Sequence, residues 1–158
     1  MLAQPTADPK PLKPMIGIEP NPRKTSLAIF THAAWNPSTR AAGLGWIVDD
    51  RDSSSSSSHS ATSEHVSSPL MAEALAVRSA INFALIQGFS SLSIFSDAKA
   101  LIDTINHKEM KTEIFGMLQD IYLSALSFMS ISFISIPRAA NEKADSIAKQ
   151  ALWALTST

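Results

Sequence analysis

The 158-residue sequence contains no cysteine, so it cannot form disulfides or thiolate zinc sites, and redox chemistry gives no indication of its compartment. It also lacks a dominant charge, because 13 Lys and Arg stand against 14 Asp and Glu. Such a chain has no overall basic field, and a nucleic-acid partner would have to be bound by local groups. The N-terminus lacks the apolar run of a signal peptide, and no segment has the length expected of a membrane span. We therefore expect an intracellular protein, in the nucleus or cytoplasm, with no membrane partner.

What the sequence does contain fits one domain. A hydrophobic content of 45% in 158 residues is enough for a sizeable core. Residues 1–24 hold six of the nine prolines and few large apolar side chains, which predicts a proline-rich lead-in or linker. We expect the domain itself to cover residues 25–155 and to be monomeric. The sequence leaves open whether the chain is part of a longer protein.

Hydrophobic periodicity and turn residues predict the order of the elements. Strands are expected over 25–35, 43–48, 60–66, 92–96 and 129–137, and helices over 69–87, 98–106, 113–128 and from Asn141 onward. Ser68 can cap the helix over 69–87, Gly88 can end it, and Asn141 is the expected cap of the last helix. The strand over 129–137 is expected to be largely buried. Three strands followed by alternating helices and strands indicate an α/β fold with helices on the faces of a mixed sheet.

A run of six serines, Ser53 to Ser58, separates the second and third predicted strands. A phosphorylated regulatory segment is one interpretation of this tract. An expanded, Ser-rich hairpin loop over residues 50–60 is the interpretation that we favour, because the cost of closing a loop grows only slowly with its length.

Three acidic residues are candidate site residues. Asp97 ends the strand-forming run from Leu92, and α/β sheets place chemistry at the carboxyl ends of buried strands. The alternative is that Asp97 only caps the helix that follows, since Asp accepts hydrogen bonds from free helix-start amides. Glu73 is open to a similar alternative, because the helix dipole favours a glutamate near a helix start. Asp145 lies in the first or second turn of the last predicted helix.

Five stretches carry a resemblance to a known family. They are Thr31–Asn36 (THAAWN), Ala41–Ile47 (AAGLGWI), Met71–Ala76 (MAEALA), Phe95–Ala98 (FSDA) and Pro137–Ala148 (PRAANEKADSIA). On these residues, which span about 28–152, the chain resembles the ribonuclease H-like superfamily, and within it the reverse-transcriptase-like, type-1 ribonuclease H domain common in plant genomes. The resemblance implies a mixed five-stranded sheet, with three antiparallel strands followed by parallel additions, flanked by helices.

The family's site consists of four carboxylates, and the resemblance assigns three of them to Glu73, Asp97 and Asp145. Clustered carboxylates repel one another unless a cation is present, so they suit hard ions such as Mg²⁺. In the family, two ions about 4 Å apart hydrolyse the RNA strand of an RNA–DNA hybrid. The resemblance therefore implies catalytic and metal-binding roles for these residues, Mg²⁺ or Mn²⁺ as cofactor, and a hybrid or other nucleic acid as partner. The expected nucleic-acid contacts are Arg138, Asn141 and Lys99.

The sequence departs from the family at the first of the four positions. The first-strand Asp, which bridges the two metal ions in the family, is His32 here. An imidazole supplies one nitrogen, cannot bridge in that way, and suits Zn²⁺ or Mn²⁺ better than Mg²⁺. We therefore expect His32 to stand as a metal ligand in the place of that Asp, with a weakened hydrolase activity and the two-metal arrangement in question. The alternative is a catalytically inactive, retroelement-derived relic or nucleic-acid-binding domain.

Overall fold

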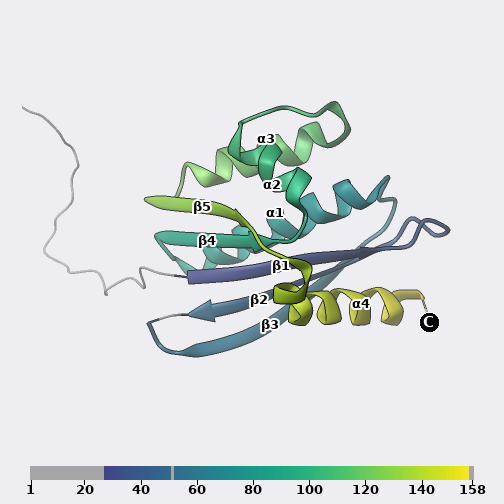
Figure 1. The fold of residues 1–158 in the computed structure, drawn as a ribbon, viewed down its shortest axis with the longest axis horizontal. Helices are drawn as coiled ribbons and strands as arrows, with labels where there is room; N and C mark the ends of the chain where they lie inside the picture. Colours follow the sequence, from purple (N-terminus) through teal and green to yellow (C-terminus); the bar gives the residue numbers. More distant parts are fainter. Residues whose placement is uncertain (1–26, 51, 157–158) are drawn as a thin grey trace, which may run out of the picture.

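A computed structural model describes residues 27–50 and 52–156. The elements are β1 (Leu27–Trp35), β2 (Ala42–Asp50), β3 (Ser55–Ser63), α1 (Pro69–Gln87), β4 (Ser91–Ser96), α2 (Lys99–Asn106), the 3-10 helix η2 (Thr112–Ile114), α3 (Phe115–Ala125), β5 (Ser130–Ser135), the 3-10 helix η3 (Arg138–Asn141) and α4 (Glu142–Thr156) (Figure 1). The predicted lead-in over residues 1–24 lies outside the described residues.

The five strands form one mixed sheet in the order β3-β2-β1-β4-β5. β1, β2 and β3 are an antiparallel meander, and β4 and β5 are added parallel to β1. The central strand β1 therefore has β2 on one side and β4 on the other, so that Thr31 lies opposite Trp46 and Ser96. This arrangement confirms the predicted α/β class with its mixed five-stranded sheet.

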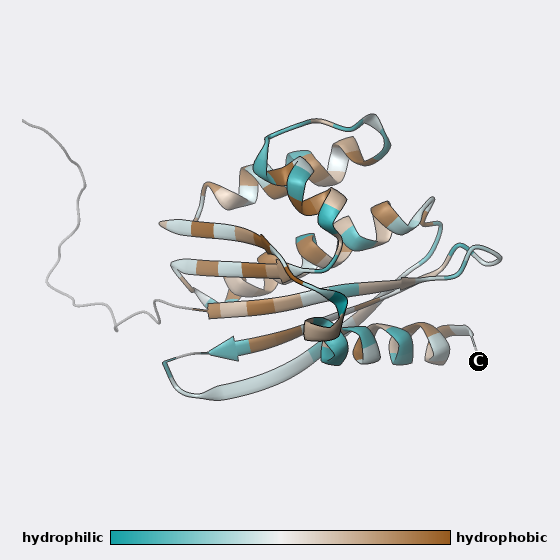
Figure 2. Cartoon of the chain, in the orientation of Figure 1, coloured by the Kyte–Doolittle hydropathy of each residue, from teal (hydrophilic) through white to brown (hydrophobic). Residues whose placement is uncertain are grey.

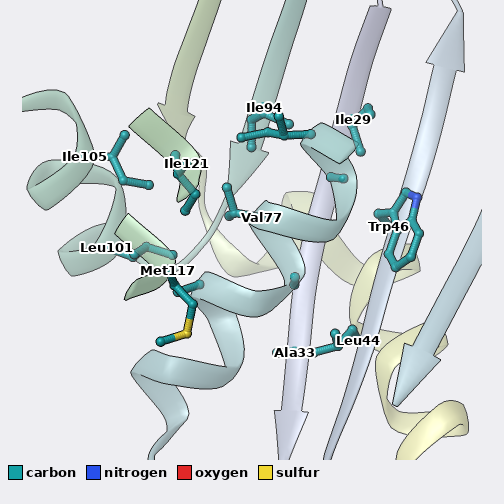
Figure 3. Packing of buried hydrophobic residues seen from close by; sticks show 14 of the residues in the cluster. Ile29, Ala33, Leu44, Trp46, Val77, Ile94, Leu101, Ile105, Met117 and Ile121 are labelled. Atoms are coloured by element: carbon teal, nitrogen blue, oxygen red, sulfur yellow. The ribbon is translucent and has the colours of Figure 1, made fainter. Parts of the chain in front are cut away.

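The main core lies between the sheet and α1, with α2 and α3 closing the same side (Figures 1 and 3). As predicted, Ser68 caps α1 by accepting a hydrogen bond from the Met71 N–H, and Gly88 ends it in a left-handed conformation at φ 83°. By length and composition alone α1 could cross a membrane, so the statement that no segment has that length is wrong for this helix. Its buried face packs in this core, and the buried residues are Ala72, Ala74, Ala76, Val77, Ala80, Ile81 and Ala84.

The opposite face of the sheet carries α4, which packs across β1, β2 and β3 (Figure 1). The close approach depends on two glycines of β2 that face the helix backbone. A Cβ at Gly45 would lie 2.8 Å from the carbonyl oxygen of Ala144, and a Cβ at Gly43 would overlap the carbonyl oxygen of Ala148. Side chains at these two positions would push α4, and with it Asp145, away from the sheet.

The prediction of a hairpin loop over residues 50–60 is wrong for most of that range. β3 begins at Ser55, and the serines pair in register with β2, with Ser55 opposite Asp50 and Ser58 opposite Ile47. The backbone makes these ladder bonds whatever the side chain, and β3 is an edge strand whose first serines are exposed, so their hydroxyls face water at no cost. Figure 2 shows β3 as a pale strand without the brown bands of its neighbours.

β5 is also exposed, contrary to the prediction that the strand over 129–137 is largely buried. It pairs only with β4 and forms the other edge of the sheet. Its exposed residues are Ser130, Ser132, Ile134 and Ser135. The alternation of Ser with Ile and Phe therefore reflects one packed and one open face.

Candidate functional site

Four side chains that are distant in sequence meet where β1 passes between α1 and α4. His32 projects from β1, Glu73 from the early part of α1, and Asp145 from the first turn of α4. Asp97 follows directly after the last residue of β4. The structure thus brings all four predicted site residues into one cluster, each held by a different element.

The His32 ring stands at the centre of this cluster. Its Nδ1 lies 3.3 Å from Asp97 Oδ1 and 3.5 Å from Glu73 Oε2, and its Nε2 lies 3.0 Å from Asp145 Oδ1. The His32 and Asp97 side chains are 7% and 3% exposed, whereas that of Asp145 is 24% exposed. One ring nitrogen therefore faces two carboxylates, and the other faces the third.

Two carboxylate oxygens of the cluster have no hydrogen-bond partner although they are buried, namely Glu73 Oε1 and Asp97 Oδ2. Burial raises the pKa of Glu73 to about 8, and the negative charge of Asp97 adds to the rise. A hydrogen bond from the Ala33 backbone and the positive charge of Arg138 act in the opposite direction. The cluster is therefore short of positive charge, and Glu73 binds a proton near neutral pH when no further cation is present.

The donor atoms fit one metal ion better than two. His32, Glu73 and Asp97 each offer one ligand atom, and these atoms all lie within 4.8 Å of one another. One nitrogen and two carboxylate oxygens suit an ion that accepts imidazole, such as Mn²⁺ or Zn²⁺, more than Mg²⁺ with its preference for oxygen. An imidazole has a single lone pair when neutral, so His32 cannot bind a second ion through Nε2 while Nδ1 holds the first.

Asp97 does not cap α2. The helix begins after Ala98 and has no capping hydrogen bond from a side chain, while the Ala98 N–H is bonded to Ser96 Oγ at 3.0 Å. The Asp97 carboxylate instead faces His32 with one oxygen and lies 3.8 Å from Arg138 Nε with the other. Asp97 therefore belongs to the cluster and is not the cap of α2.

The three predicted nucleic-acid contacts lie in different settings. Arg138 stands beside the site with its side chain 81% exposed, and Lys99 is exposed on α2, where it pairs with Asp103 at 2.8 Å. Asn141 is buried, and its Nδ2 donates to the Thr31 carbonyl at 2.8 Å. Its Oδ1 has no hydrogen-bond partner, so the prediction that Asn141 caps the last helix is wrong, since its side chain instead ties η3 to β1.

The sequence analysis did not identify Lys149, a basic residue beside the site. Lys149 Nζ lies 3.1 Å from Asp145 Oδ2, on the same face of α4. The signal that could have identified it is the spacing of four residues between an acid and a base on a predicted helix. The pair holds the Asp145 carboxylate between Lys149 and His32.

Comparison with known proteins identifies a matching family and structures of the same fold. The family described as Reverse transcriptase-like matches residues 30–151, whereas no curated protein matches the sequence. The RNase H1 of the halophilic archaeon Halobacterium salinarum is similar in structure, with 20% identity, a TM-score of 0.74, and coverage of 80% of this chain and 97% of that one. The N-terminal RNase H domain of a Mycobacterium tuberculosis protein has 18% identity and a TM-score of 0.73, with coverage of 80% of this chain and 98% of that one. LC11-RNase H1 in complex with an RNA/DNA hybrid has 17% identity and a TM-score of 0.70, with coverage of 79% of this chain and 95% of that one. At these identities the likeness establishes the fold.

Proposed function

Because the chain belongs to the reverse transcriptase-like family of ribonuclease H-like domains, we propose that it binds RNA–DNA hybrids and hydrolyses their RNA strand weakly, using one divalent ion. The observation that carries the proposal is the group of ligand atoms from His32, Glu73 and Asp97 within 4.8 Å of one another. The partner is supported by LC11-RNase H1, a structural neighbour that was solved with an RNA/DNA hybrid.

The second ring nitrogen of His32 supports a metal-binding role for the first. When Nε2 carries the proton, it faces Asp145 Oδ1 at 3.0 Å, and the lone pair of Nδ1 then faces Asp97 and Glu73. A carboxylate that fixes the tautomer of a ligating histidine is a common second partner in metal sites. A divalent ion held there supplies Lewis acidity and a more acidic bound water. Asp145 orients His32 in this arrangement, and Lys149 positions Asp145.

Weak turnover follows from the number of ions and from the use of Asp145. A single ion cannot stabilise both the attacking and the leaving oxygen of a phosphodiester as two ions do. Asp145 is held at the far ring nitrogen, on the side of His32 away from Glu73. Of the three acids in the site, only Glu73 and Asp97 would therefore bind the ion together with His32.

A second candidate function is binding without cleavage, as in an inactive, retroelement-derived domain. The observation that favours it is the position of both His32 nitrogens within 3.5 Å of carboxylates. A doubly protonated ring would pair with acids on both sides and compensate their charge with no metal bound. The exposed Arg138 beside the site would then contact a phosphate without any chemistry following.

The test measures cleavage and binding of an RNA–DNA hybrid on the same chain. A labelled RNA–DNA hybrid is incubated with Mn²⁺ or Mg²⁺, with Asp97→Asn as the inactive variant and Asp120→Asn, a surface acid of α3, as the matched control. We expect slow cleavage that is faster with Mn²⁺, lost in Asp97→Asn and kept in Asp120→Asn. Hybrid binding without cleavage in either metal would select the second candidate. Loss of both binding and cleavage in the wild-type chain would reject both candidates.

A further inference from the structure

A hollow of about 360 Å³ lies between the sheet and the start of α4, on the same face of β1 as His32. Phe30 precedes His32 by two positions on the strand, so both side chains project from this face. The hollow is lined by strand residues and by the turn that leads into α4, and these residues are Phe30, Ile47, Asp49, Ser56 and 139–144. It is separate from the carboxylate cluster and has no part in the chemistry proposed above.

Phe30 lines this hollow, and its aromatic ring is supported by a second ring behind it. Its ring stacks on that of Phe95 with centroids 4.7 Å apart and an interplanar angle of 14°. β1 lies between β2 and β4, so Phe95 stands on the β4 side of Phe30 and the hollow on the β2 side. Beyond Phe95, Ile134 of β5 is 38% exposed, which shows that this part of the sheet face is open. Rigid aromatic rings on an open sheet face are platforms on which flat bases stack.

The hollow is lined by both acidic and basic residues. Asn141 is 2% exposed, its Nδ2 is bonded to the Thr31 carbonyl, and its Oδ1 is buried, so this side chain fixes the wall of the hollow. Two acidic residues, Asp49 and Glu142, belong to the lining as well, together with one basic residue, Lys143. A complementary ligand therefore has a flat ring, N–H groups on its edge, and one negative group.

We propose that this hollow binds the base of an unpaired nucleotide, stacked on Phe30, with its N–H groups donating to Glu142 and its phosphate beside Lys143. Guanine matches best, because adjacent imino and amino donors on its edge can both reach one carboxylate. The proposal rests on the nucleic-acid binding proposed above and adds to it a single-stranded segment next to the hybrid. The hollow and the cluster share β1 and α4, so one strand of nucleic acid could reach both.

The experiment compares a blunt RNA–DNA hybrid with the same hybrid carrying a single-stranded overhang that ends in guanine. The binding readout is anisotropy, and 2-aminopurine placed in the overhang reports stacking by quenching. We expect the wild-type chain to bind the overhang hybrid about fivefold or more tighter than the blunt one. Phe30→Leu should abolish that preference and the quenching, whereas Phe133→Leu, the same change on β5, should keep both. Equal affinities for the two hybrids in the wild-type chain, or a preference unchanged by Phe30→Leu, would overturn the proposal.

Two further arms keep the result interpretable. Lys143→Gln changes an exposed side chain, so it tests the hollow even if Phe30→Leu destabilises the domain, and we expect it to weaken overhang binding and its salt dependence. Guanosine monophosphate alone, tested as a competitor, distinguishes a free nucleotide from an overhang as the occupant, and competition at equal affinity would reject the single-strand part. Cleavage of the blunt hybrid is followed in the same samples. An overhang preference without cleavage would reject only the hydrolase proposal, and cleavage without an overhang preference would reject only the hollow.

Discussion

The two faces of the sheet are made of different residues. Toward α1 the strands present aliphatic side chains that are fully buried, such as Ile29 of β1 and Ile94 of β4 (Figure 3). Toward α4 the same strands present His32 and Phe30, and β2 presents Gly43 and Gly45. We infer that the α1 face supplies most of the folding stability, whereas the α4 face carries His32 and Asp145 of the candidate site.

The largest effect is expected from removing core volume on the α1 face. Ile94→Ala should lower the free energy of unfolding by about 2–5 kcal/mol, because Ile94 is 0% exposed and its loss leaves a cavity beneath α1. The matched change on the other face, Ile134→Ala, should cost less than about 1 kcal/mol, since that side chain is 38% exposed. Denaturant unfolding measures both. Equal losses would contradict the division between the two faces.

The next effect concerns chemistry on the α4 face. His32→Asp places a carboxylate at the centre of the cluster, where the His32 ring now faces Glu73, Asp97 and Asp145. We expect Mg²⁺-dependent cleavage of an RNA–DNA hybrid to rise by about 100-fold or more, because a bridging oxygen ligand permits two hard ions. Initial rates in Mg²⁺ and Mn²⁺ measure the gain. No gain, in a variant that still folds, would mean that substrate contacts limit the reaction.

A third change tests whether α4 itself depends on close packing. Gly43→Ala places a Cβ against the Ala148 carbonyl and the Leu152 backbone, which cannot move aside as a flexible side chain could. We expect a loss of about 1–3 kcal/mol in unfolding free energy and a fall in Mn²⁺ affinity, because Asp145 moves with the helix. Gly116→Ala is the control, since a Cβ there meets no atom within 4 Å. A stable variant with intact metal binding would show that α4 can shift without disturbing the site.

Helices and strands could be predicted where their capping residues and hydrophobic pattern lie within or next to the element itself. α1 was predicted with its bounds because Ser68, Gly88 and the apolar stripe all lie within or next to it. β3 and the exposure of β5 were not, because a serine strand has no periodicity and because the neighbours of a strand decide its burial. Edge strands in a sheet are fixed by pairing order, which the sequence pattern left open.

The resemblance predicted that the site residues lie together, but not the geometry of the cluster. The resemblance assigned Glu73, Asp97 and Asp145 to one site and identified His32 as the departure from the family. The sequence could not indicate that the His32 ring faces acids through both nitrogens, because that depends on how α1 and α4 lie across the sheet. It also could not indicate that Asn141 bonds to Thr31, since the two residues are 110 positions apart and meet only in the folded chain.

The fourth prediction is a pH dependence of stability that originates in the cluster of His32, Glu73, Asp97 and Asp145. The pKa of Glu73 rises from 4.5 to about 8 on folding, so the folded state binds the proton more tightly than the unfolded state. Stability from this group is therefore fully present below about pH 4.5 and is lost as the pH rises toward 8, with a slope of at most about 1.4 kcal/mol per pH unit. Glu73→Gln should flatten the slope in chemical denaturation between pH 5 and 8, and Mn²⁺ should flatten it in the wild-type chain, because a cation favours the ionised carboxylate. A slope unchanged by Glu73→Gln would assign the pH dependence to other groups and would leave the charge deficit of the cluster without its expected consequence.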